Sequence, residues 1–185
     1  YCIPGDTSTC NAPIARWKMD EGVDNVCSAT QDVCDTSGNQ NHGTSTGSSW
    51  QFVPRCHEGW CLEFDGVDDH IAAADTNALD FGTGDFTLEA WINFTADLGL
   101  RTGIFAKNNG HNTQGYILGL AGSGESLLVD LHDGTNFVES GGSGSSLNDG
   151  QWHHVVVTVN RTTDIARRYV DGVQIGSDTD ISSLT

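Results

Sequence analysis

Short runs in which apolar and polar residues alternate recur along the chain from residue 14 onward. The clearest reads FTLEAWINF, in which Phe86, Leu88, Ala90, Ile92 and Phe94 alternate with Thr87, Glu89, Trp91 and Asn93. Because successive side chains of a strand point to opposite faces, this period of two predicts a strand with one mainly apolar face. Further strand-like runs occur at residues 14–19, 62–64, 70–73, 104–107, 116–120, 127–132, 153–160 and 166–170.

Clusters of glycine, asparagine, aspartate and serine separate these runs. Residues 65–69 form one such turn, and the pairs Asp133–Gly134 and Asp171–Gly172 are typical of tight hairpins. No segment shows the apolar stripe of an ordinary amphipathic helix. Short strands at this spacing predict an all-β sandwich or barrel.

The first thirteen residues differ from the rest because they lack an apolar period and contain Pro4, Gly5 and Pro13. We interpret residues 1–13 as a disulfide-stapled lead-in or linker and residues 14–185 as one domain, since a β-sandwich of this length is usually undivided. The Gly/Ser run at residues 140–146 reads as a loop, because strand-like sequence resumes within a few residues.

Six cysteines form three close pairs, which are Cys2 with Cys10, Cys27 with Cys34, and Cys56 with Cys61. None of the pairs is a C-x-x-C motif, which disfavours a metal or redox site. Short loops close at low entropic cost, so we predict three sequential disulfides. Disulfides persist in oxidising compartments, which predicts an extracellular or cell-surface protein. Reduced, buried cysteines are the alternative.

The chain is strongly acidic, with 25 Asp and Glu against 8 Lys and Arg and a formal net charge of −17. Such a charge opposes binding to nucleic acid and to anionic lipid. No apolar stretch reaches the about 18 residues of a membrane span, so no membrane insertion is expected. Divalent cations and neutral sugars are compatible partners, although acidity also serves plain solubility.

Six motifs occur in order along the chain: ARWKMDEG from Ala15, DTSGNQNHG from Asp35, LEFDGVDDHI from Leu62, FTLEAWINF from Phe86, DGQWHHVVVTVN from Asp149 and RYVDGVQIG from Arg168. Their order and rough spacing resemble the laminin-G-like jelly-roll family of bacterial secreted proteins. The resemblance covers nearly all of residues 14–185. It implies a concanavalin A-like, two-sheet antiparallel jelly roll that serves as a binding module in surface proteins, adhesins and polysaccharide-degrading enzymes.

The chain departs from the family pattern in two places. Between Glu21 and Asp35, where the family has a short linker, it carries an insert bounded by Cys27 and Cys34. The family also continues beyond the position of Thr185 through two further strands. We therefore expect the domain to lack its last strands, which a longer chain or a partner strand would complete.

Two acidic loops suggest a calcium site, because calcium prefers several oxygen ligands. Asp35, Asn39 and Asn41 lie in one loop, and Asp68 and Asp69 lie in another that the family fold places nearby. Adjacent aspartates repel each other unless a cation or hydrogen-bond donors offset the charge. We predict one calcium ion held by these five residues, with Asp20 and Asp65 as second-rank ligands. Asx turns and strand caps are the alternative.

Sugars stack on exposed aromatic rings and hydrogen-bond to polar loop residues. On this basis the predicted ligand-binding residues are Trp50, Trp60, His111 and Tyr116, whereas Trp17 and Trp152 lie in strand-like runs and are predicted to be core.

No catalytic group is predicted. The adjacent His153 and His154 point to opposite faces of a strand and cannot hold one ion together. The E-x-D-x-x-E string of jelly-roll glucanases and the G-x-S-x-G elbow of hydrolases do not occur, and Glu89 is isolated. The sequence therefore predicts a non-enzymatic protein.

The resulting function hypothesis is an extracellular, calcium-assisted module that binds a glycan or a protein surface ligand within a larger cell-surface or adhesive protein. The alternative is a structural subunit or decoration domain of a surface filament or pilus, which would self-assemble or join neighbouring domains.

Overall fold

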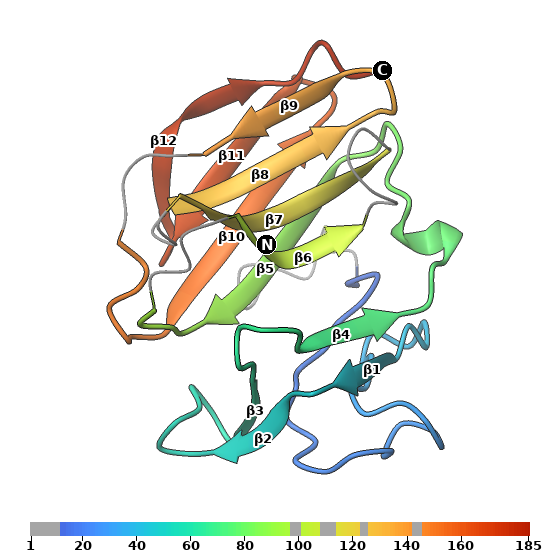
Figure 1. The fold of residues 1–185 in the computed structure, drawn as a ribbon. Coiled ribbons are helices and arrows are strands. Elements are labelled where there is room, and N and C mark those ends of the chain that lie inside the picture. The colour runs from blue at the N-terminus through green and yellow to red at the C-terminus, as the bar shows by residue number, and fades with distance from the viewer. Residues whose placement is uncertain (1–11, 97–100, 108–113, 123–125, 142–145) are drawn as a thin grey trace. The chain divides into compact units, whose positions relative to one another are not determined.

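The computed structural model describes residues 12–96, 101–107, 114–122, 126–141 and 146–185 (Figure 1). The chain forms two compact units, Tyr1–Leu79 and Asp80–Thr185. The predicted lead-in lies almost wholly outside the described residues, so the boundary after residue 13 stays a prediction. Among the described residues, no helix has the length and apolar character of a membrane span.

The first unit contains two small antiparallel ladders. Its elements are β1 (Gly43–Thr46), β2 (Ser49–Phe52), β3 (Trp60–Glu63), β4 (His70–Ala73) and the 3₁₀ turn η1 (Asn77–Leu79). Strand β1 pairs with β4, and β2 pairs with β3. The predicted strand at residues 14–19 forms only an isolated bridge, Trp17 to Asp35. Met19 has a positive φ of 56°, which is incompatible with an extended strand.

Two disulfides staple this unit. Cys27 is bonded to Cys34, with a Cα–Cα distance of 5.3 Å, and Cys56 is bonded to Cys61, with a Cα–Cα distance of 5.5 Å. Two of the three predicted sequential bridges are therefore confirmed. The third, between Cys2 and Cys10, lies outside the described residues.

The buried Asp32 attaches the stapled insert to β1. One carboxylate oxygen accepts the backbone N–H of Asn25 at 2.8 Å, and the other accepts that of Ser45 at 2.9 Å. Next to it, the fully buried Val33 exchanges backbone hydrogen bonds with Gly43. A buried carboxylate is tolerated here because both oxygens have donors.

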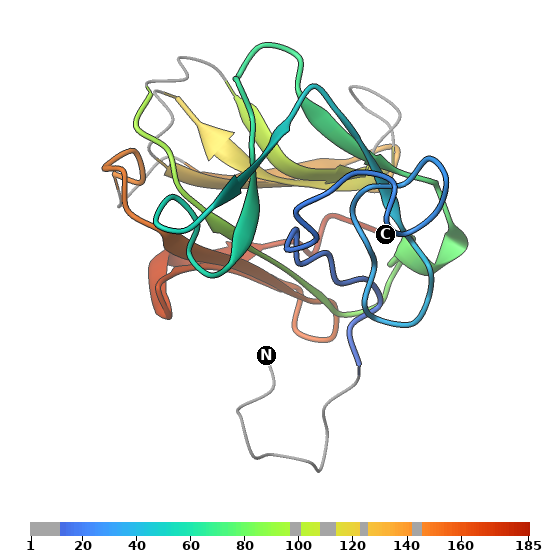
Figure 2. The ribbon, with the colours of Figure 1, turned by 90° about the horizontal axis from the view of Figure 1, so that it is seen from below.

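The second unit consists of two four-stranded antiparallel sheets (Figures 1 and 2). Their strands are β5 (Phe86–Ile92), β6 (Thr102–Lys107), β7 (Gly115–Ala121), β8 (Ser126–His132), β9 (Phe137–Ser140), β10 (His153–Asn160), β11 (Ile165–Val170) and β12 (Val173–Asp180). The strand orders are β12-β11-β10-β5 and β6-β7-β8-β9. The predicted all-β, concanavalin A-like sandwich is confirmed.

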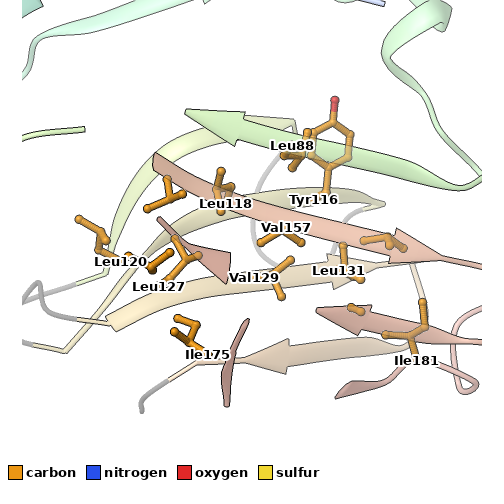
Figure 3. Packing of buried hydrophobic residues seen from close by; sticks show 14 of the residues in the cluster. Leu88, Tyr116, Leu118, Leu120, Leu127, Val129, Leu131, Val157, Ile175 and Ile181 are labelled. Atoms are coloured by element: carbon orange, nitrogen blue, oxygen red, sulfur yellow. The ribbon is translucent and has the colours of Figure 1, made fainter. Parts of the chain in front are cut away.

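Apolar side chains from both sheets of the second unit form its core (Figure 3). Leu118, Leu127 and Val129 come from β7 and β8, and Val155 and Val157 come from β10. Their burial supplies the main force that holds the two sheets together. The apolar residues of the predicted strands thus form the interior of the sandwich, as expected.

One charged side chain enters this apolar layer. Arg168 on β11 is buried and donates from Nη1 to the backbone carbonyl of Leu127 on β8 at 2.8 Å, which links the two sheets. Burial lowers the pKa of its guanidinium.

Replacing Leu118, which is 0% exposed, by Ala should remove buried contacts and leave a cavity. The expected loss in the free energy of unfolding is about 2–5 kcal/mol, measured by urea denaturation with circular dichroism. Val173→Ala, at a position 66% exposed, is the control and should change stability by no more than about 0.5 kcal/mol. Equal losses for the two variants would contradict the assigned core.

Candidate functional site

The loop that carries Asp35 is held by the protein's own hydrogen bonds. Asp35 is 6% exposed, and its carboxylate accepts the backbone N–H groups of Arg16, Ser37 and Asn41 at 2.8–2.9 Å. Burial disfavours its charged form, but these donors and the Ser37 hydroxyl outweigh burial and lower the pKa of Asp35 to about 2. The aspartate is therefore ionised and is already compensated by donors.

The two asparagines of the same loop also have partners. Asn39 and Asn41 donate from Nδ2 to the backbone carbonyl of Ile14 at 2.9 and 3.2 Å. Asn41 accepts the Thr76 hydroxyl at its Oδ1 at 3.1 Å. These contacts match the Asx-turn and capping interpretation of the loop more closely than an open cage of oxygens.

A separate group of carboxylates lies in the loop between β3 and β4. Carboxylate oxygens of Asp65, Asp68 and Asp69 lie within 4.8 Å of one another. Among the described residues, Asp35 belongs to no such group of three, so the structure joins Asp68 and Asp69 to the second-rank Asp65 rather than to Asp35. Whether any of these residues binds calcium stays a prediction.

Local hydrogen bonds shape this acidic loop. Asp69 accepts the backbone N–H of Asp65 at 2.8 Å, and Asp65 accepts that of Val67 at 2.8 Å. Gly47, with φ +82°, lies so close that a Cβ there would be 1.9 Å from Asp69 Oδ1. Only glycine at this position leaves room for the Asp69 carboxylate.

Of the predicted ligand-binding aromatics, Trp50 and Trp60 lie opposite Leu62 and Phe52 in the β2–β3 hairpin. The Trp50 indole donates to Asp24 at 2.7 Å. Trp60 is 38% exposed, and its ring centroid lies 4.9 Å from that of Phe52. The hairpin thus presents a pair of partly exposed rings.

The other two predicted ligand-binding residues do not extend this surface. Tyr116 was expected near a loop, but it lies in β7, is 5% exposed and belongs to the core cluster, where its ring stacks on Phe81. The run from Tyr116 to Leu120 is apolar on both sides, so its periodicity did not reveal this burial. His111 lies outside the described residues.

An aromatic group that sequence reasoning did not select lies on the outer face of the sheet β12-β11-β10-β5. Trp91 on β5 is opposite His154 on β10, and the two rings stack with centroids 5.1 Å apart. His154 Nε2 also lies 3.5 Å from a Glu89 carboxylate oxygen. The sequence did contain a signal for this group, because Trp91 occupies a polar position of the alternating run and was therefore expected on the outer face.

His153 precedes His154 on β10, points to the opposite face of the sheet and bridges two aspartates. Its Nδ1 lies 2.7 Å from Asp171 and its Nε2 lies 3.1 Å from Asp149. The bond to Asp171 raises the pKa of His153, burial opposes this shift, and Asp149 reinforces it. Because Asp171 also accepts the backbone N–H of His154 at 2.9 Å, the bridge ties the β11–β12 turn to the start of β10.

One pair of acids lies across β8 and β9 in the second unit. Asp130 is directly opposite Glu139, and Arg101 forms ion pairs with both. Burial raises the pKa of Asp130, Arg101 opposes that shift, and Glu139 adds to it. The arginine compensates the two carboxylates, as expected of a structural ion-pair network.

Comparison with known families agrees with this architecture. Residues 65–185 match the laminin G model described as the concanavalin A-like lectin/glucanases superfamily. The chain therefore belongs to this superfamily, and its laminin G-type members are generally binding modules. No curated protein matches the chain.

The His153 bridge should make stability depend on pH. The pKa of His153 is raised above its ordinary value of 6.5, so its stabilising contribution is complete below that pH and is lost as pH rises through the folded-state pKa. The pKa values of Asp149 and Asp171 are lowered, so their contributions are lost only in stronger acid. His153→Gln should therefore destabilise by roughly 1 kcal/mol more at about pH 5.5 than at about pH 8.5.

Urea denaturation at the two pH values measures this difference. Val173→Ala, which changes no ionisable group at a position 66% exposed, is the control and should show no such pH-dependent loss. A His153→Gln penalty that is equal at both pH values would refute the charged bridge.

Proposed function

We propose that this chain is an extracellular module that binds carbohydrate with the assistance of calcium. The observation that carries the proposal is the partly exposed Trp60–Phe52 pair, because it lies on a hairpin whose second strand leads directly into the Asp65–Asp69 loop. The aromatic pair offers a stacking surface and the loop offers oxygen-rich side chains, and sugar binding uses both kinds of group.

The hairpin holds the Trp60 ring in a defined orientation. Trp60 and Phe52 are cross-strand partners, and the Cys56–Cys61 disulfide ties the loop between them to β3. Gly22 approaches the same indole so closely that a Cβ there would lie 2.6 Å from ring atoms. A ring held in place before binding loses little conformational entropy when a ligand stacks on it.

Calcium would act on the loop that follows β3. Asp65, Asp68 and Asp69 offer hard oxygen ligands, and Asp65 and Asp68 are exposed. A divalent cation bound there would offset the repulsion among the three carboxylates. It would also stabilise the loop conformation, because the unfolded chain does not hold these ligands together.

Extracellular function is supported by the two disulfides and by membership of a lectin-type superfamily. Binding without catalysis is supported by Arg101, which forms ion pairs with both Asp130 and Glu139. A glycosidase needs two carboxyl groups free to face its substrate.

Self-assembly into a surface filament or pilus is a second candidate. The exposed large apolar side chains of the first unit favour it, and they are Ile14, Val23, Val26, Phe52, Val53, Trp60, Phe64 and Val67. Such groups promote association when they form a contiguous patch. An assembly subunit would sediment as concentration-dependent oligomers and give no sugar signal.

Thermal melts in calcium and in chelator test the metal. At free calcium about 100-fold above the dissociation constant, binding should stabilise the folded state by about 2.7 kcal/mol. Asp68→Asn should remove most of the calcium-dependent rise in Tm, whereas Asp164→Asn, in the β10–β11 turn, should retain it. Superimposed wild-type melts in the two buffers would show that no stabilising calcium binds.

A glycan array tests the ligand class. Wild-type protein should bind a set of glycans in calcium, and Trp60→Ala should weaken that binding about tenfold by removing the stacking surface. Val26→Ala, also in the first unit and 53% exposed, is the control and should bind like wild type. Absence of any glycan signal in calcium, with concentration-dependent oligomers, would favour the assembly alternative.

A further inference from the structure

The outer face of the sheet β12-β11-β10-β5 carries a row of side chains that the proposed calcium-assisted site does not use. On β5, Thr87, Glu89 and Trp91 point away from the core. Their β10 partners are Thr158, Val156 and His154, in the same order. Thr158 and Val156 are in turn opposite Arg167 and Tyr169 on β11. The pairing therefore places three parallel rows of outward side chains side by side.

Trp91 provides a fixed apolar surface at one end of these rows. Its side chain is 49% exposed, although large apolar residues on strands are usually covered. The stacked imidazole of His154 supports the indole, and the Glu89 carboxylate lies beside that imidazole. An exposed ring of this kind, with hydrogen-bonding groups at its edge, is suited to the C–H face of a sugar ring.

A polar hollow lies at the other end of the same face. It has a volume of about 300 Å³ and is lined by Asp85, Phe86, Thr87, Thr158, Val159, Asn160 and Arg167. Thr87, which lines the hollow, and Trp91 are four residues apart on β5, so their Cα atoms are separated by about 13 Å. The stacking ring and the hydrogen-bonding hollow therefore lie at two separate positions along one sheet face.

The charges on this face select against anions. Arg167 is held by both carboxylate oxygens of Asp178, at 2.8 and 2.7 Å, so its charge is compensated. Asp85 adds negative charge beside the hollow and Glu89 adds it in the middle of the β5 row, and both residues are exposed. An acidic polysaccharide would be repelled, whereas the hydroxyl groups of a neutral one can donate to these carboxylates.

We propose that this face is a second carbohydrate site, which binds a neutral polysaccharide chain along β5 and β10 without calcium. Trp91 stacks on one sugar ring, and Thr87, Thr158 and Asn160 hydrogen-bond to another sugar of the same polysaccharide. The site shares with the proposed function only the class of ligand. Its residues all belong to the second unit, so it does not depend on the Asp65–Asp69 loop.

Affinity electrophoresis in native gels that contain chelator tests this proposal. The probes are galactomannan, β-glucan and dextran as neutral chains, and hyaluronate as an anionic one. At least one neutral polysaccharide should retard the wild-type protein, and hyaluronate should not. Trp91→Ala should weaken the affinity about tenfold, while Trp91→Phe, which keeps an aromatic surface, should lose less.

The second unit offers a matched control. Phe137 on β9 is 59% exposed and stacks on its cross-strand partner His132, with centroids 5.3 Å apart. Phe137→Ala therefore removes an exposed ring that also stacks on a histidine but lies in the sheet β6-β7-β8-β9. This variant should leave retardation unchanged. If Trp91→Ala fails to fold, Glu89→Ala, at an exposed position of the same face, tests the second site instead. This variant should weaken retardation several-fold.

Two results would overturn the second site. One is that no neutral polysaccharide retards the wild-type protein in chelator, or that hyaluronate retards it as strongly. The other is that folded Trp91→Ala and Glu89→Ala migrate like wild type. Retardation that appears only in calcium and disappears in Trp60→Ala would leave the proposed function standing while removing this second site.

Discussion

Burial of one face of each strand in the sheet β12-β11-β10-β5 is the constraint on which the second unit depends. Val155 and Val157 on β10 must face the core, together with Leu88 on β5. A strand has a period of two, so a shift by one residue would bring Glu89 and His154 inward. The apolar core therefore determines both the register of these strands and which side chains are presented to ligands.

The same constraint explains how the outer face acquires its order. Once the inner residues are packed, Trp91 and His154 become direct cross-strand neighbours, and their stacking requires no loop. Side chains carried by sheet strands hold their positions more accurately than side chains carried by loops. The His153 bridge to Asp149 and Asp171 reinforces this arrangement at the beginning of β10.

Local patterns predicted the features that local physics determines. The alternation over residues 86–94 correctly indicated the inner and outer residues of β5, and short spacing correctly paired Cys27 with Cys34 and Cys56 with Cys61. The strand expected at residues 14–19 did not form beyond a single bridge, and Met19 has a positive φ that an extended strand does not allow.

Features that depend on packing between distant segments could not be predicted from local sequence patterns. Tyr116 has turn residues close by in the sequence, yet the core of the second unit covers it. Asp35 was grouped with Asp68 and Asp69 because the family fold places their loops near each other, but the Asp35 carboxylate accepts backbone N–H groups of Arg16 and Asn41. Trp91 was visible as an apolar residue in a polar row, but only the sheet register shows that His154 supports it.

The central claim is that two tryptophans, one in each unit, contact carbohydrate. The indole N–H signals of the five tryptophans in a ¹H–¹⁵N spectrum test this directly, with Trp60 and Trp91 assigned by substitution to Phe. During titration with a retarding neutral polysaccharide, fragmented to soluble oligosaccharides, the Trp91 signal should shift in chelator. In calcium, a glycan selected on the array should shift the Trp60 signal. Shifts confined to the other three indoles, or no shift at saturating sugar, would contradict the account.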